Sequence, residues 1–156
     1  MTKLQKGAKK VKKKTALLIL AFILLGVFAQ SCEKKKSGIT IKKNVNDQNI
    51  TFIVSVKNAP NKVHALGFEV IYDPLALKYV RYKEGKSVRE FQMFGAHKVK
   101  EGLVRVGGFA AGEKSIKKDA SGELVILEFE WINSEQKAGI TLAKLLDDIS
   151  GWNPQE

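Results

Sequence analysis

Apolar residues alternate with other residues along most of this chain from Ile39 onward, and this period of two constrains the fold more than any other feature. Leu66, Phe68, Val70 and Tyr72, for example, share one face of a predicted strand. Successive side chains of a β-strand point to opposite faces, whereas an amphipathic helix repeats about every 3.6 residues. The chain beyond residue 39 is therefore predicted to consist of strands that each bury one face.

Seven segments carry this pattern or a shorter version of it, and turn-forming residues separate them. The predicted strands are residues 38–43, 50–57, 65–72, 77–83, 102–109, 125–131 and 139–145, and the predicted turns are residues 44–49, 58–61, 112–122 and 133–139. Seven or so short strands at this spacing indicate an all-β, two-sheet sandwich. Residues 86–94 stay open between a helical turn and a strand, because Val88, Phe91 and Phe94 recur every three residues.

The N-terminal segment has the composition of an export signal. Seven lysines lie in the first fourteen residues, and no acidic residue precedes Glu33. Residues 16–29 are uncharged and would span about 21 Å as a helix, which is short of the ~30 Å hydrocarbon core of a bilayer. A basic stretch followed by an apolar helix of this length is typical of a secretory signal peptide.

The only cysteine follows this apolar segment directly, in the order Ala29-Gln30-Ser31-Cys32. This arrangement resembles a bacterial lipoprotein signal with its lipobox. The resemblance implies a signal peptide over residues 1–31, cleavage between Ser31 and Cys32, and lipidation of Cys32. Residues 32–38 would then be a polar tether, and Glu33 favours delivery to the outer membrane or cell surface. The alternative is an uncleaved signal anchor with an incidental cysteine.

The net charge of +11 suggests nucleic-acid binding at first sight. Removing the seven N-terminal lysines leaves +4, so the excess is mostly a property of the export signal. The remaining basic cluster, interleaved with Phe91 and Phe94, consists of Lys83, Lys86, Arg89, Lys98, Lys100 and Arg105. Lysines of this kind keep sheet edges soluble and unpaired, so no nucleic-acid partner is predicted.

Few residues offer catalytic or metal-binding chemistry. Glu128 and Glu130 are about 7 Å apart on one strand face, within the range of glycosidase carboxylates, but they lie on its polar side. His64 and His97 have no ligand-type neighbours in sequence. Hence no enzyme activity and no cofactor are predicted. Calcium bound by Asp147 and Asp148, with Asp119 as another hard oxygen ligand, stays as an alternative.

Exposed aromatic rings would indicate carbohydrate binding. Tyr82 and Trp152 are the candidates for stacking on a sugar, and Trp152 could instead close the edge of the sandwich. Trp131 shares its strand face with Leu127 and Phe129 and is predicted to lie in the core.

Three stretches of the chain together resemble a cohesin domain. They are residues 54–60, residues 65–80 with the specific Tyr72-Asp73-Pro74 element, and residues 102–130 with Gly107-Gly108. The resemblance covers residues 39–152, which leaves residues 153–156 as a tail. It implies a jelly-roll sandwich of about nine strands. Proline at position 74 restricts the backbone of Asp73 and ends its strand, and the Asp73 carboxylate is predicted to accept turn N–H groups. Gly107-Gly108 is predicted to mark a bulge, a close backbone approach or a bend at a sheet edge.

The resemblance also implies a function. Cohesins hold calcium-loaded dockerin modules, which carry polysaccharide-degrading enzymes, and the calcium loops belong to the dockerin. We therefore predict a membrane-anchored, non-catalytic module that binds a dockerin-like protein outside the cytoplasm. The alternatives are a carbohydrate-binding module of related fold, with a polysaccharide as ligand, and a structural lipoprotein of the cell envelope.

Overall fold

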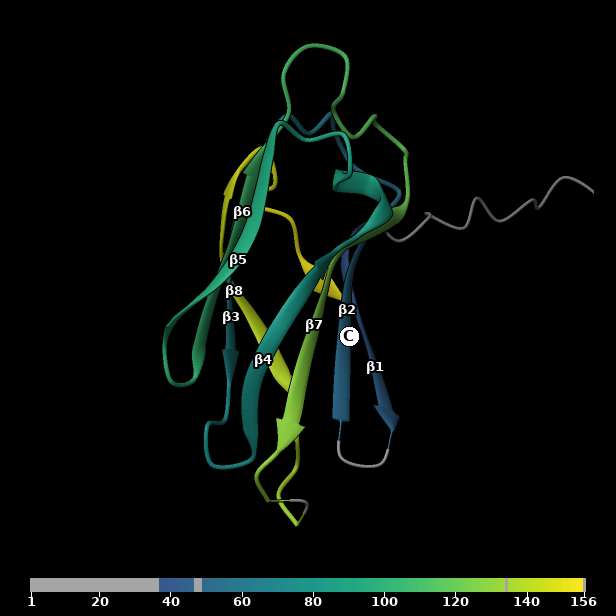
Figure 1. The fold of residues 1–156 in the computed structure, drawn as a ribbon. Coiled ribbons are helices and arrows are strands. Elements are labelled where there is room, and N and C mark those ends of the chain that lie inside the picture. The colour runs from purple at the N-terminus through teal and green to yellow at the C-terminus, as the bar shows by residue number, and fades with distance from the viewer. Residues whose placement is uncertain (1–36, 47–48, 134, 156) are drawn as a thin grey trace, which may run out of the picture. The chain divides into compact units, whose positions relative to one another are not determined.

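Nine strands in the described part of the chain pair into two facing sheets, as the alternation predicts (Figure 1). The structure is a computed structural model that describes residues 37–46, 49–133 and 135–155. The strands are β1 (Gly38–Asn46), β2 (Asn49–Lys57), β3 (Ala65–Tyr72), β4 (Leu77–Glu84), β5 (Met93–Lys100), β6 (Leu103–Phe109), β7 (Gly122–Trp131), β8 (Ile140–Asp147) and β9 (Pro154–Gln155). A 3-10 helix, η1 (Lys86–Val88), lies between β4 and β5. The predicted signal peptide, its cleavage site and Cys32 lie outside the described residues.

The two sheets have different sizes. One has the strand order β4-β7-β2-β1-β9 and the other the order β5-β6-β3-β8. All neighbours are antiparallel except β1 and β9, where Ile39 and Thr40 pair in parallel with Pro154 and Gln155. Figure 1 shows β4, β7, β2 and β1 side by side in one layer, with β5, β6, β3 and β8 in the other. This is the jelly-roll sandwich that the resemblance implies.

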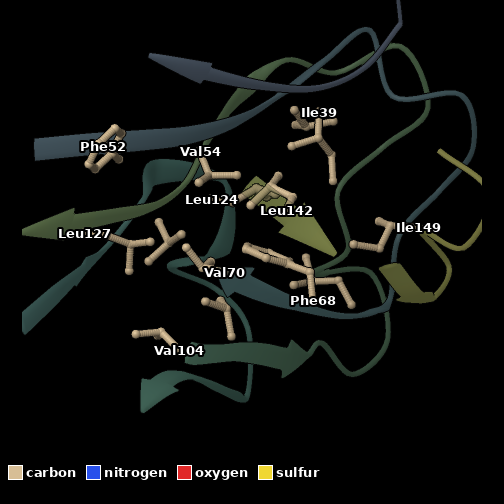
Figure 2. Packing of buried hydrophobic residues seen from close by; sticks show 14 of the residues in the cluster. Ile39, Phe52, Val54, Phe68, Val70, Val104, Leu124, Leu127, Leu142 and Ile149 are labelled. Carbon is tan, nitrogen blue, oxygen red and sulfur yellow. The ribbon is translucent and has the colours of Figure 1, made fainter. Parts of the chain in front are cut away.

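The core fills the space between the sheets with the alternating residues of the central strands. Phe52 and Val54 on β2, Leu127 on β7 and Phe68 and Val70 on β3 are at most 2% exposed. Figure 2 shows these side chains pointing toward one another between the strands. Burial of apolar side chains in this way supplies most of the stability of a sandwich, about 1.5–3 kcal/mol for each large side chain.

Phe129 on β7 is the centre of an aromatic cluster. Its ring centroid lies 5.6 Å from that of Phe52, 5.1 Å from that of Tyr72 and 5.6 Å from that of Tyr79, in edge-to-face arrangements. Tyr72 belongs to β3, so these contacts connect the two sheets. Trp131 continues the same face of β7 and is half-buried against the core.

The observed elements extend the predicted ones. Of the open alternatives for residues 86–94, the helical turn is confirmed at η1, Lys86–Val88, whereas β5 begins only at Met93 and continues to Lys100, beyond that segment. The predicted turn over residues 44–49 was too wide, because β1 and β2 pair up to Asn46 and Asn49. The expected tail includes β9, which covers the edge of β1 at Ile39 and Thr40.

The unit Lys35–Glu156 is compact, and the buried apolar residues of its described part form one core cluster. In its described part, no helix has the length and apolar character that a membrane span requires.

Replacing Phe129 by Ala tests the aromatic cluster. We expect the variant to lose about 3–5 kcal/mol of unfolding free energy, since it opens a cavity between the sheets. Ile132 is 58% exposed, and Ile132→Ala should change the unfolding free energy by less than about 0.5 kcal/mol. Urea denaturation followed by tryptophan fluorescence measures both, and equal losses would contradict the packing described above.

Candidate functional site

The outer face of the four-stranded sheet carries the residues that alternate with the core. On β3, the buried Leu66, Phe68 and Val70 face inward. Gly67 and Glu69 therefore lie on the outer face of the sheet, away from the core.

Three glycines are direct neighbours across this outer face. Gly107 on β6 pairs with Gly67 on β3 and with Gly95 on β5. These glycines come from separate parts of the sequence, and the register alone places them in one row. A row without side chains leaves bare backbone across three adjacent strands. We call the depression over this row the glycine groove.

The glycine groove has a volume of about 760 Å³ and two different walls. Ala65, Phe109 and Met93 pair across the strands along one wall. Along the other wall, Glu69 pairs with Arg105, and Arg105 pairs with His97. The two walls are four residues apart along β6, or about 13 Å at ~3.3 Å per residue.

The ends and rim of the groove are formed by larger side chains. A Cβ atom added to Gly67 would lie 3.5 Å from the Cβ atom of Leu146, and one added to Gly95 would lie 3.5 Å from the Tyr82 hydroxyl. Met93 is 64% exposed, Leu146 55% and Phe109 42%. Exposed large apolar residues gathered around a depression are typical of an interaction site.

Glu69 lies in the groove wall with two cations above it. Its side chain is 8% exposed, whereas those of Arg105 and Lys144 are 53% and 67% exposed. Arg105 donates from Nη2 to Oε1 at 2.9 Å, and Lys144 Nζ lies 3.0 Å from Oε2. These hydrogen bonds, first that of Arg105 and then that of Lys144, hold the pKa of the Glu69 carboxyl below its ordinary value.

A β-bulge brings Lys144 into this cluster. The pairing of β3 with β8 shifts between Gly67 and Glu69, so that Ala143 lies opposite Glu69 and Leu146 lies opposite Gly67. Lys144 adopts a φ of 47°, in the left-handed region that costs a non-glycine residue energy. Bulges redirect side chains in this way, and here the redirected side chain reaches the Glu69 carboxylate.

The outer face of the larger sheet is polar by comparison. It carries an ion-paired cluster in which Arg81 and Lys83 on β4 both contact Glu128 on β7. Lys83 and then Arg81 lower the pKa of the Glu128 carboxyl. Glu130 pairs with Lys78, so both carboxylates of the predicted pair are held in surface ion pairs. This arrangement gives neither of them the environment of a catalytic acid.

The predicted Tyr72-Asp73-Pro74 element is a structural turn at the end of β3. Asp73 Oδ1 accepts the N–H of Leu75 at 2.8 Å, as predicted, and its carbonyl accepts that of Leu77 at 2.9 Å. Tyr72 is 4% exposed and belongs to the core. The element therefore positions β4 and lies outside the groove.

Gly107 and Gly108 continue the β6 ladder without a bulge. β6 pairs with β3 on one side and β5 on the other, so an edge bend was the wrong interpretation. A Cβ atom on Gly108 would lie 2.6 Å from the Met93 carbonyl oxygen, which is the close backbone approach. A Cβ atom on Gly107 would meet nothing nearer than 3.5 Å.

Trp152 is not a stacking platform. It is 8% exposed, and its indole N–H donates to Asn61 Oδ1 at 2.9 Å, so it closes the edge of the sandwich. The alternative that Trp152 closes the sandwich edge is therefore the one that the structure favours, since its buried ring leaves little surface for a sugar. Tyr82 is half-buried against the core, with its hydroxyl beside Gly95, and its stacking on a sugar stays a prediction.

Of the predicted calcium ligands, Asp148 binds the backbone through its carboxylate, and Asp147 lines the groove beside Gly67. Asp148 Oδ2 accepts the N–H groups of His64 and Ala65 at 2.7 and 3.0 Å, which lowers the pKa of its carboxyl. Within the described ranges, no three His, Cys, Asp or Glu side chains come together as a possible metal site. His97 is exposed on β5, beside Arg105.

The family model for the cohesin domain matches residues 36–150. No curated protein sequence matches the chain.

Solved structures of cohesins have the same fold. A type II cohesin from the adaptor scaffoldin of Acetivibrio cellulolyticus is 16% identical, with a TM-score of 0.61 over 79% of this chain and 95% of that chain. The sixth cohesin of scaffoldin B from the same organism, solved in complex with a dockerin, is 20% identical, with a TM-score of 0.59 over 72% and 86%. A non-cellulosomal cohesin from the archaeon Archaeoglobus fulgidus is 17% identical, with a TM-score of 0.57 over 76% and 84%.

The lowered pKa of Glu69 predicts part of the acid sensitivity of the fold. The unfolded chain takes up this proton at a higher pH than the folded one, so stability present above about pH 4.5 is lost as the pH falls. In Glu69→Gln, the unfolding free energy should fall less steeply between about pH 4.5 and pH 3 than in the wild type. Urea titrations across this range measure the slopes.

The exposed Glu90 supplies the control for this experiment. Glu90→Gln should keep the wild-type slope. If Glu69→Gln and the wild type fall in parallel with pH, Glu69 is not held ionised as described.

Proposed function

Because this chain belongs to the cohesin family, we propose that it is a membrane-anchored receptor whose glycine groove binds a dockerin-type module of another protein. Cohesin domains are non-catalytic protein-interaction modules, so the chain is not an enzyme. The assignment of the binding face rests on the concentration of exposed apolar side chains around the groove.

The two outer faces differ in what they offer a partner. The groove combines the exposed apolar side chains of Met93, Phe109 and Leu146 with the ionic cluster of Arg105, Glu69 and Lys144. Protein interfaces typically have an apolar centre and a polar rim, with charged residues depleted at the centre. The face with Arg81, Lys83 and Glu128 carries surface ion pairs. Its apolar pair, Ile53 and Ile126, is only half-buried and so less exposed than Met93, Phe109 and Leu146.

The dimensions of the groove suit a helix. An α-helix with its side chains is about 10–12 Å across, and the walls of the groove are about 13 Å apart. The glycine floor lets a helix approach the sheet backbone closely, since Gly67, Gly95 and Gly107 place no side chain in its way. A helix lying along the row would contact both walls at once.

Dockerins are the partner class that the related structures support. The cohesin from scaffoldin B was solved with a dockerin bound. A second complex in the same fold is a type II cohesin with an X-dockerin from Acetivibrio cellulolyticus. The archaeal relative is described as non-cellulosomal, so a role in polysaccharide degradation depends on which enzyme the partner carries.

We propose anchoring through Cys32, because an apolar segment and small residues precede the only cysteine. The acyl chains of a lipoprotein contribute roughly 0.8 kcal/mol per buried CH₂, so several chains on one residue give stable attachment. The domain would then lie outside the cytoplasm, at the outer membrane or cell surface.

Filling the groove should abolish partner binding without unfolding the domain. Gly107→Leu adds a side chain to the floor, and the position has room for its Cβ atom. Thr51→Leu makes a comparable change on the outer face of the larger sheet. Full-length chain immobilised on beads is offered the secreted proteins of the source cells with calcium, and bound proteins are identified by mass spectrometry.

The wild type and Thr51→Leu should capture the same dockerin-bearing protein, whereas Gly107→Leu should capture at most about a tenth as much. Urea denaturation checks that both variants are folded. Capture of no dockerin-bearing protein by the wild type would overturn the partner class. Equal capture by all three chains would overturn the binding face. Retention of the chain on a polysaccharide gel without any protein partner would favour a carbohydrate-binding module instead.

The intact mass of the native protein tests the anchor. We expect the native chain to begin at Cys32 and to carry acyl groups. We expect the Cys32→Ala chain to be neither cleaved at this site nor acylated. An unmodified full-length mass for the native protein would show an uncleaved signal anchor and contradict the lipoprotein assignment.

A further inference from the structure

The ionic cluster of the groove exposes its cations and buries its anion. The Arg105 and Lys144 side chains are 53% and 67% exposed, while that of Glu69 between them is 8% exposed. A partner approaching this wall therefore meets two cations, and their cluster with Glu69 has one net positive charge. The other carboxylate of the groove is that of Asp147, whose Oδ2 would lie 3.6 Å from a Cβ atom added to Gly67, so the attraction for an anion is confined to the wall that Arg105 and Lys144 form.

Glu69 holds both cations in place. Arg105 spends one of its N–H donors on Oε1, and a guanidinium has five. Lys144 reaches the same carboxylate from the bulge in β8, at the cost of its left-handed backbone. Unfavourable backbone of this kind persists where the surrounding structure holds it and is enriched at binding sites. Both cations thus keep donors directed at the groove without having to be ordered by the partner.

Apolar side chains lie within the same groove. Leu146 stands at the β8 end beside Gly67, and Phe109 and Met93 form the wall opposite Arg105. A segment spanning the groove would bury aliphatic side chains against one wall and place polar ones against the other.

We propose that the glycine groove selects partner segments that carry carboxylates beside aliphatic side chains, with Arg105 and Lys144 as the residues that determine this specificity. The inference rests on the proposed binding face and names the chemistry of its partner. Carboxylates accept charge-assisted hydrogen bonds from both cations, and Arg105 can bind one with two donors. A basic segment would be repelled by the same cations, so the cluster also excludes partners.

The larger sheet provides a control within the same molecule. Arg81, Lys83 and Glu128 repeat the arrangement of two exposed cations around one carboxylate, with cation exposures of 64% and 56%. Reversing both cations changes the net charge equally in either cluster. Any general attraction between a basic protein and acidic peptides is therefore the same for Arg105→Glu/Lys144→Glu and for Arg81→Glu/Lys83→Glu.

The test uses a displayed library of helical peptides with leucines along one edge and randomised residues along the other. Binders are selected on the purified full-length chain in mild detergent. The dissociation constants of individual clones are then measured against the wild type, both double variants and Gly107→Leu. We expect an excess of Asp and Glu at the randomised positions. The groove double variant should weaken binding about tenfold or more, and the Arg81 and Lys83 double variant less than about threefold.

The possible outcomes separate the two proposals. Clones that need an open Gly107 but bind the groove double variant as well as the wild type would overturn the charge selectivity and leave the binding face intact. Clones that bind Gly107→Leu unchanged would overturn the binding face itself. Equal weakening by both double variants, or no acidic excess, would show that Arg105 and Lys144 determine no specificity.

Discussion

The alternation of buried and outward side chains on the central strands β2, β7, β3 and β6 is the constraint on which the rest of this structure depends. The two sheets share one core, so Leu66 and Phe68 must face inward. Gly67 and Glu69 must then face outward, because a strand offers no other direction. A shift of one residue would expose the core and turn Glu69 inward, away from Arg105 and Lys144. Packing between the sheets therefore fixes which residues form the outer face that we propose as the binding surface.

The pairing of β6 with both β3 and β5 turns this constraint into a candidate site. It aligns Gly67, Gly107 and Gly95 and sets Glu69, Arg105 and His97 beside one another one step along the strands. Glycines weaken strand interiors because they leave nothing to pack. Three glycines in one row on the outer face of a sheet allow another backbone to approach that face closely. The ionic cluster beside them presents positive charge to a partner, since its cations are exposed and its carboxylate is buried.

Much of the fold could be predicted from the sequence, whereas the site could not. Residues 65–72 were predicted to the residue, because four apolar side chains alternate there without interruption. β5 was missed as a separate strand, since Gly95 and Ala96 interrupt its pattern. The groove depends on long-range register and on a bulge that brings in Lys144, and neither leaves a local signal. Trp152 stayed open between stacking on a sugar and closing the sandwich edge, because its partner, Asn61, is far away in sequence.

The proposed function requires that the partner contacts the chain at the glycine groove. Nuclear magnetic resonance of the isotope-labelled chain, titrated with the protein that it captures, locates this contact residue by residue. We predict that the largest chemical shift changes fall on the backbone amides of Gly67, Gly95 and Gly107. Changes confined to Thr51, Glu128 and their neighbours on the larger sheet would contradict it.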